Sequence, residues 1–228
     1  MEMFENKGKI YTFLNPVSYL EALKNKDLYT GFDGILVDGK FLAVAIRLFY
    51  CQRVKRLSFD MTSLAPELFA YSEIHNKTIY IVAGKQDELD STVATFAEYY
   101  PRLNFVGTRN GYFDDNQAIE CEIQKIVSVN PDFVICGMGA LKQEQFLMRL
   151  KKAGYKGVGF TCGGFISQTS KRNDIVYYPK FFDILDIRFI YRIIKEKHTR
   201  KRYIQAFFFF PISFLKEWFG CFEFHKDG

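Results

Sequence analysis

The chain has 228 residues, of which 48% are hydrophobic and 25% charged, and its formal net charge is +5. This length suits one domain of ordinary size with its own core, and no apolar run approaches the roughly 20 residues of a membrane-spanning helix. Five cysteines without metal-ligand spacing, and no secretory signal peptide, exclude a disulfide framework and a zinc site. We therefore expect reduced thiols and a cytoplasmic location.

Apolar runs typical of buried strands alternate with helical patterns along most of the chain. Strands are predicted at Ile10–Leu14, Gly34–Val37, Thr78–Val82, Leu103–Val106, Phe133–Cys136 and Val158–Thr161. Helices are predicted at Pro16–Lys26, Lys40–Tyr50, Met61–His75, Gln86–Tyr99, Asp114–Val129 and Leu141–Ala153. This alternation predicts an α/β fold, a Rossmann-like and mostly parallel sheet with helices on both faces. Ligands of such sheets bind outside the carboxyl ends of the strands.

The chain changes character near residue 180. A helix is predicted at Phe181–Lys197, and an aromatic run, Phe207–Leu215, follows it. Seven basic residues lie between positions 188 and 202 against the single acid Glu196: Arg188, Arg192, Lys195, Lys197, Arg200, Lys201 and Arg202. We predict a core domain, residues 1–180, and a helical C-terminal appendage, residues 181–228, that associates with an anionic membrane surface. Packing between copies of the chain, as a homo-oligomer, is the alternative.

An acidic residue, Asp38, closes the second predicted strand, where a parallel sheet binds its ligands. A carboxylate at this place can take a proton from an attacking hydroxyl. An Asp-Gly pair is equally typical of a turn or of a helix cap, and the local sequence leaves both interpretations open.

Two glycine-containing stretches, Gly107–Phe113 and Gly137–Glu144, follow later predicted strands. Glycines there allow backbone N–H groups to approach a phosphate, and the N-terminus of the next helix adds positive potential. A tight strand-to-helix turn is the structural alternative for each stretch.

These features together resemble the WecG/TagA/CpsF family of bacterial glycosyltransferases (glycosyltransferase family 26). The similarity lies in Gly107-Thr-Arg-Asn-Gly-Tyr-Phe113, Gly137-Met-Gly-Ala-Leu-Lys-Gln-Glu144, Asp38-Gly39 and the run from Asp186 to Glu196. It implies an inverting enzyme of surface polysaccharide synthesis that transfers a sugar from a UDP-sugar to a polyprenyl-diphosphate-linked saccharide and forms a β-linkage. The enzyme would work peripherally on the inner face of the bacterial cell membrane. Hexose, N-acetylhexosamine and hexuronate donors all stay open.

The resemblance also implies roles for individual residues. Asp38 would be the catalytic base, and Arg56, Arg192 and Arg202 would stabilise the departing UDP, with Lys55 as the alternative to Arg56. Tyr112 would contact the base or ribose, and Gln143 would read the uracil edge. Substrate binding is implied for Asn15, Gly107, Gly111, Tyr112, Gly137, Gly139, Lys142, Gln143, Glu144, Gly163 and Gly164.

No Asp-x-Asp pair that would hold a divalent metal occurs in the sequence, so we expect activity without a metal or another cofactor. A nucleotide-sugar epimerase or dehydrogenase is disfavoured because no GxGxxG follows the first strand. A non-catalytic, membrane-docked partner of another glycosyltransferase stays open. Nucleic-acid binding is the least favoured function, since no recognition motif accompanies the basic run.

Overall fold

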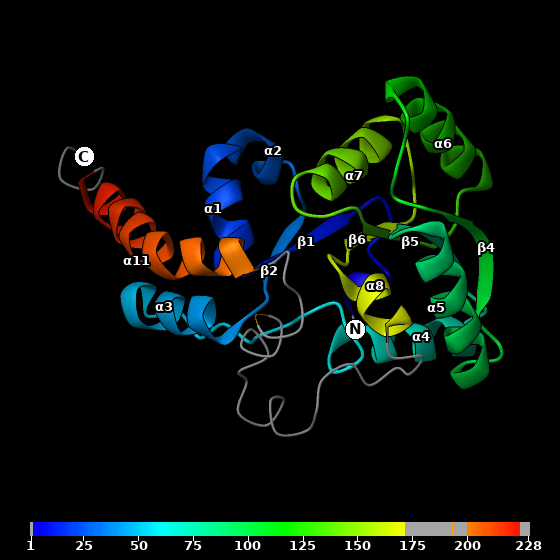
Figure 1. Cartoon of the computed structure of the whole chain (residues 1–228), viewed down its shortest axis with the longest axis horizontal. Helices are drawn as coiled ribbons and strands as arrows, with labels where there is room; N and C mark the ends of the chain where they lie inside the picture. The colour runs from blue at the N-terminus through cyan, green and yellow to red at the C-terminus, as the bar shows by residue number, and fades with distance from the viewer. Residues whose placement is uncertain (1, 172–192, 194–199, 224–228) are drawn as a thin grey trace. The chain divides into compact units, whose positions relative to one another are not determined.

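The computed structural model describes residues 2–171, residue 193 and residues 200–223. Its centre is one six-stranded sheet with the strand order β2-β1-β6-β5-β3-β4 (Figure 1). Pairing is parallel between β1 and β6, β6 and β5, β5 and β3, and β3 and β4. The strands are β1 Ile10–Leu14, β2 Gly34–Val37, β3 Thr78–Ala83, β4 Asn104–Arg109, β5 Phe133–Gly137 and β6 Val158–Thr161. The predicted α/β fold is confirmed.

One short helix precedes the first strand in the chain, and the other described helices connect the strands or follow them. The helices are η1 Glu2–Phe4, α1 Pro16–Lys24, α2 Lys26–Thr30, α3 Lys40–Tyr50, α4 Leu64–Ile74, α5 Gln86–Tyr99, α6 Asn116–Val129, α7 Lys142–Lys152, α8 Phe165–Ser170 and α11 Arg200–Glu223. Among the residues that the structure describes, no helix is long and apolar enough to cross a membrane.

Alternate residues of the central strands are buried on opposite faces of the sheet. From β3, Ile79 and Ile81 join a cluster with side chains of α4, α5 and α8, whereas Tyr80 and Val82 join one with side chains of α6 and α7. This two-residue period follows from the pleat of a strand. Both faces of the sheet are therefore covered, as a parallel sheet requires.

Three local differences from the predicted elements have physical explanations. The helix predicted at Pro16–Lys26 is divided, because α1 ends at the cap residue Asn25, whose Nδ2 donates to the carbonyl of Glu21 at 2.9 Å. Strand β4 extends to Arg109, so Gly107 lies within a strand and not in the predicted loop. Helix α8 was not predicted, and its six residues are too few for a clear helical period.

Internal contacts group the chain into two compact units. Unit 1 holds the described residues of 1–13, 27–36 and 57–177, and unit 2 holds those of 14–26, 37–56 and 178–228. Unit 2 thus combines α1 and α3 with α11. The predicted boundary at residue 180 and the predicted helix Phe181–Lys197 lie outside the described residues, apart from Ile193, so the division into core and appendage stays a prediction.

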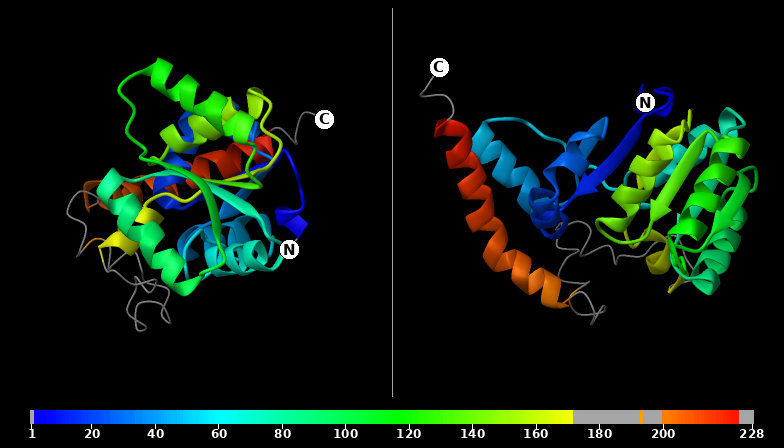
Figure 2. Two further views of the ribbon diagram at one scale, coloured as in Figure 1. Left: turned by 90° about the vertical axis from the view of Figure 1, so that its right-hand side faces the viewer. Right: turned by 90° about the horizontal axis from the view of Figure 1, so that it is seen from above.

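Within unit 2, α11 packs on both α1 and α3 (Figure 2). The ring of Phe214 lies 5.8 Å from that of Tyr19 on α1 and 5.7 Å from that of Phe49 on α3. The indole Nε1 of Trp218 donates to the carbonyl of Phe49 at 2.8 Å. These contacts hold the basic and aromatic helix against residues from the first quarter of the chain.

Candidate active site

In unit 2, a sharp turn after β2 sets the position of Asp38. The backbone N–H of Asp38 donates to the carbonyl of Leu14 at 2.7 Å, so the ends of β1 and β2 lie together. Gly39 has a φ of +118°, a conformation that L side chains rarely adopt. The glycine allows the chain to leave the strand and enter α3 at once, and this fixes Asp38 at the carboxyl end of β2.

Arg56 lies beside Asp38. Its Nε is 4.0 Å from Oδ1 of Asp38, and the two side chains are 22% and 33% exposed. The alternative cation, Lys55, is an exposed residue. A carboxylate that can accept a proton and a guanidinium that can bind phosphate oxygens therefore occupy one place in the molecule.

Asn15 follows β1 and begins α1. Its Oδ1 accepts from the backbone N–H groups of Val17 and Ser18 at 2.9 and 3.1 Å, and the hydroxyl of Ser18 accepts from the backbone N–H of Asn15. This reciprocal arrangement is a capping box, which gives Asn15 a structural task. Its predicted contact with the sugar or acceptor stays a prediction.

The structure describes one of the two arginines of the appendage that are predicted to contact the diphosphate. Arg202 is exposed in the first turn of α11, within unit 2. Arg192 lies outside the described residues. Their proposed contact with the diphosphate is therefore carried by the sequence alone.

In unit 1, the loops at the carboxyl ends of β3, β4 and β5 are joined by backbone hydrogen bonds. The N–H of Gly84 donates to the carbonyl of Gly137 at 3.2 Å, and the N–H of Gly111 donates to the carbonyl of Gly84 at 2.9 Å. At the next strand, the N–H of Cys162 donates to the carbonyl of Cys136 at 2.7 Å. The loops thus form a continuous backbone surface where a parallel sheet binds ligands.

Four of the six glycines predicted to bind substrate fall into two groups. A Cβ at Gly107 would lie 2.1 Å from the buried ring of Tyr80, and one at Gly137 would lie 2.6 Å from Sγ of Cys162, so packing alone requires both glycines. Gly139 and Gly163 have φ values of +84° and +57°, and, apart from the adjoining residues, no atom of the part of the chain that the structure describes lies within 4 Å of the position of their Cβ. Within that part, these two glycines leave open space beside the backbone.

The side-chain amide of Gln143 is buried and engaged within the protein. Its Oε1 accepts from the backbone N–H of Gly163 at 3.1 Å, and its Nε2 donates to Oε1 of Glu144 at 2.9 Å. Gln143 therefore links the loop after β5 to the loop after β6. This arrangement gives Gln143 a positioning role, and its predicted reading of the uracil edge stays a prediction.

Glu144 is fully buried and is the centre of this network. Its Oε1 also accepts from the hydroxyl of Thr12 at 2.9 Å, and Oε2 accepts from the N–H of Leu141 at 2.7 Å. Burial raises the pKa of Glu144, and the accepted hydrogen bonds offset part of that effect. The bond to Leu141 stabilises an unusual φ of +74° there, which shapes the loop between Gly139 and α7.

Exposed side chains also surround these loops. The side chain of Tyr112 is 66% exposed, while its backbone N–H donates to Oδ1 of Asn110 at 3.1 Å. Lys142 is exposed at the first position of α7, and Gly164 is the N-cap of α8. Tyr112 and Lys142 are thus accessible to a ligand of unit 1.

Two residues of this region were missed by sequence reasoning. Gly84 has a φ of +59° and bonds to two neighbouring loops, and its signal was a glycine directly after the apolar run of β3. Thr12 donates to Glu144 and lies 3.0 Å from the hydroxyl of Thr161. No local pattern indicates Thr12, because its partners are far away in the sequence.

A covered parallel sheet with glycine-containing loops at its carboxyl ends is the architecture of α/β proteins that bind ligands at this edge. The chain belongs to the glycosyl transferase WecG/TagA/CpsF family, whose model matches residues 1–221. This result confirms the predicted family, and with it the general activity of a sugar transferase.

Two relatives illustrate the similarity. The chain is 30% identical to a UDP-Gal:alpha-D-GlcNAc-diphosphoundecaprenol beta-1,4-galactosyltransferase of Shigella boydii, over 94% of this chain and 90% of that protein. It is 24% identical to an N-acetylglucosaminyldiphosphoundecaprenol N-acetyl-beta-D-mannosaminyltransferase of Bacillus subtilis (strain 168), over 86% of this chain and 75% of that protein.

Proposed function

We propose that the protein is an inverting glycosyltransferase that moves a sugar from a UDP-sugar to a polyprenyl-diphosphate-linked saccharide and forms a β-linkage. The pairing of Asp38 with Arg56 carries this proposal, because it combines a proton acceptor with a phosphate-binding cation. The names of both relatives specify transfer to an N-acetylglucosaminyl diphosphoundecaprenol and a β-linked product. They specify different sugars, so the donor sugar of this chain is left open.

In the proposed reaction, the carboxylate of Asp38 takes the proton from the acceptor hydroxyl as this oxygen attacks the anomeric carbon. The bond from that carbon to the UDP oxygen breaks, and the configuration inverts. Arg56, with Arg192 and Arg202, stabilises the negative charge that develops on the diphosphate. Arginines then supply the electrostatic stabilisation for which other transferases use a metal ion.

The loops of unit 1 are proposed to bind the nucleotide. Gly139 and Gly163 leave open space beside the backbone, Tyr112 and Lys142 are exposed, and α7 directs its N-terminus to the same loop. Gln143 and Glu144 hold this loop in shape.

The proposed place of action is the inner face of the bacterial cell membrane, with α11 as the contact. Basic residues begin this helix, and Phe207, Phe208 and Phe209 on it are 73%, 63% and 58% exposed. Exposed aromatic side chains next to cationic ones are typical of helices that lie in a lipid interface.

The decisive experiment compares Asp38→Asn with the wild type and with Asp27→Asn, an exposed acid on α2. Transfer from UDP-galactose or UDP-N-acetylmannosamine to N-acetylglucosaminyl diphosphoundecaprenol is measured in EDTA, together with UDP binding by calorimetry. We expect Asp38→Asn to lose at least 100-fold in kcat, with UDP affinity within about threefold. Asp27→Asn should behave as the wild type.

The same experiment tests the alternative, a non-catalytic membrane-docked partner of another glycosyltransferase. Such a partner would show no transfer in this assay. Replacement of Asp38 would also leave its non-catalytic function unchanged. Turnover that requires added Mg²⁺ or Mn²⁺ would contradict the metal-free mechanism but not the proposal that the protein is a glycosyltransferase.

A further inference from the structure

Helix α3 carries an apolar stripe that the protein leaves exposed. Phe41, Val44 and Leu48 recur at helical spacing on one side of the helix, and they are 55%, 45% and 68% exposed. On other sides of α3, Leu42 is buried and the ring of Phe49 packs against α11. The stripe thus leaves most of Leu48 and about half of Phe41 and Val44 accessible.

Helix α3 itself carries charge of one sign only. Its charged residues, Lys40 and Arg47, are exposed, and it contains no aspartate or glutamate. A surface that combines exposed apolar side chains with cations alone is complementary to an anionic lipid leaflet.

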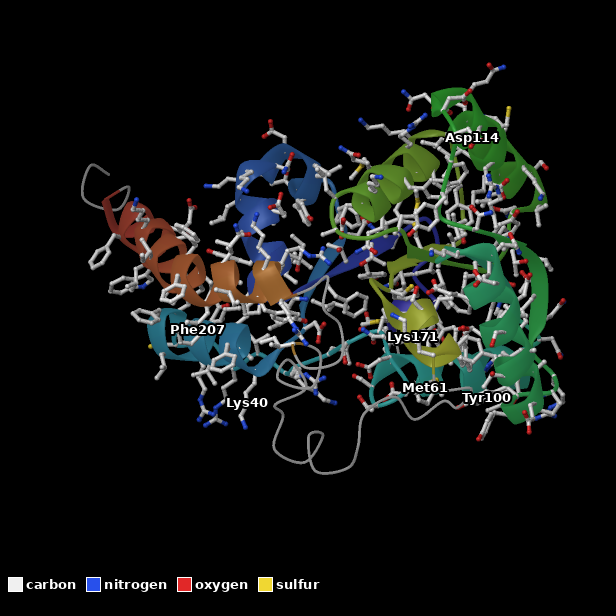
Figure 3. The ribbon with its side chains drawn as sticks, in the orientation of Figure 1. Lys40, Met61, Tyr100, Asp114, Lys171 and Phe207 are labelled. Atoms are coloured by element: carbon white, nitrogen blue, oxygen red, sulfur yellow. The ribbon has the colours of Figure 1, made fainter. Side chains whose placement is uncertain are left out.

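The helix that packs against α3 carries exposed apolar side chains of the same kind. Helix α11 packs on α3 through Phe214 and Trp218, and Ile204, Phe208 and Ile212 on α11 are 55%, 63% and 54% exposed. Residues 200–216 contain four basic residues and no acid. Figure 3 labels Lys40 on α3 and Phe207 on α11, the two helices that unit 2 holds together.

We propose that α3 is a second lipid-binding element, in which Phe41, Val44 and Leu48 insert into an anionic leaflet while Lys40 and Arg47 contact lipid phosphates. The proposal rests on the proposed function, because it adds a second element to the membrane contact of α11. Since α3 begins two residues after Asp38, lipid contact by α3 holds the proposed base at the membrane surface. An acceptor diphosphate attached to a lipid lies at the same depth.

Tryptophan fluorescence tests this surface directly, because Trp218 is the one tryptophan of the chain. In a Trp218→Phe background, a tryptophan replaces Leu48, Phe208 or Ile74 in turn. Ile74 is the matched control, since it is 69% exposed on α4 of unit 1 and follows an acid, Glu73. Each full-length variant is mixed with phosphatidylglycerol vesicles that carry brominated acyl chains, which quench tryptophan within the acyl region.

We expect Leu48→Trp and Phe208→Trp to shift to shorter emission wavelengths and to lose at least half of their intensity, and Ile74→Trp to lose little. Quenching of Phe208→Trp without that of Leu48→Trp would overturn the role of α3 and leave membrane docking by α11. No quenching of either would overturn both proposals. A blue shift of Leu48→Trp that grows with protein concentration without vesicles would also overturn the proposal, by identifying a second copy of the chain as the occupant.

A second measurement keeps Trp218 and does not depend on the probe. The double variant Val44→Ser/Leu48→Ser is sedimented with anionic vesicles beside the matched variant Ile74→Ser/Val129→Ser, whose replaced side chains are similarly exposed. We expect at least a tenfold weaker apparent affinity for the α3 variant and no change for the control. Equal affinity of both variants would contradict lipid insertion by α3.

Discussion

Asp38 and Arg56 come together although a whole helix separates them in the sequence. The turn at Gly39 fixes the carboxylate, and the segment after α3 returns the guanidinium to within 4.0 Å of it. Since a guanidinium presents a planar fork to phosphate oxygens, an amine at this place is not equivalent to it.

The first prediction concerns this arginine. Arg56→Ala should lower kcat/KM for the UDP-sugar about 100-fold, because one electrostatic contact to the leaving group is lost. Lys55→Ala is the matched control and should stay within about threefold of the wild type. Steady-state transfer assays at fixed acceptor concentration check the pair, and the reverse order of effects would assign the diphosphate contact to Lys55.

The second prediction separates the two groups of glycines. Gly107→Ala places a methyl group against the ring of Tyr80 and should lower the free energy of unfolding by about 1–3 kcal/mol. A methyl group at Gly139 meets no neighbour among the described residues, so the stability cost of Gly139→Ala should be about 1 kcal/mol from the positive φ, while UDP binding should weaken. Urea unfolding and UDP calorimetry on both variants check the contrast. A more stable Gly107→Ala would contradict the packing explanation.

At the scale of the element, α11 shows how one helix presents two different sides. Phe210 and Phe214 are buried against α1 and α3, whereas Phe208 and Phe219 are exposed. The ion pair between Lys26 and Glu217, at 2.6 Å, adds a polar contact on the packed side. The helix is therefore held to unit 2 by its inner aromatic residues and leaves the outer ones for another partner.

The third prediction tests whether the buried side of α11 holds the helix while its exposed side does not. Phe214→Ala should detach α11 and destabilise unit 2 by about 3–4 kcal/mol, because a buried aromatic side chain leaves a cavity among Tyr19, Phe49 and Tyr50. Phe208→Ala, on the exposed side, should change stability by less than about 0.5 kcal/mol. Hydrogen exchange of residues 200–223 measures the detachment. Equal protection of α11 in both variants would show that other contacts hold the helix.

The elements themselves were largely predictable from the sequence. Strands β1, β2 and β6 and helices α3 and α5 have the predicted bounds, because short apolar runs and amphipathic periods are local signals. The extension of β4 was not predictable, because Gly107 lies in this strand against the ring of Tyr80, which belongs to the neighbouring strand β3. Likewise, Thr12 and Glu144 meet only in the folded protein, so nothing in the local sequence indicated Thr12. The substrate contact that the family resemblance implies for Glu144 stays a prediction.

At the scale of the whole molecule, Asp33 ties together three distant segments of unit 1. Its carboxylate accepts from Lys9 at 2.9 Å, from the backbone N–H of Ile10 at 2.9 Å and from Lys151 at 2.6 Å. Burial of the carboxylate acts to raise its pKa, but these hydrogen bonds outweigh burial and lower the pKa of Asp33 to about 2.

The fourth prediction is the pH dependence that follows. Because the pKa of Asp33 is lower in the folded state than in the unfolded state, its stabilising contribution is present above pH 5 and is lost as the pH falls toward 2. Asp33→Asn should therefore reduce the free energy of unfolding by on the order of 2 kcal/mol at pH 7 and by much less near pH 2. Urea titrations from pH 2 to 7 check this, with the exposed Asp114→Asn as control. A pH-independent difference would contradict the linkage.

The strand order has a consequence for how the chain acquires its structure. Strand β1 is made among the first residues, yet its partner β6 is made almost 150 residues later, as the pair Ile10 and Gly159 shows. Contacts between such distant segments slow folding, because the loop between them must close before the pairing stabilises anything. During synthesis, β1 therefore cannot pair with β6 until nearly the whole sheet has emerged from the ribosome. A chain that stops before Val158 would leave the centre of its own sheet open to other strands, and we expect such fragments to aggregate.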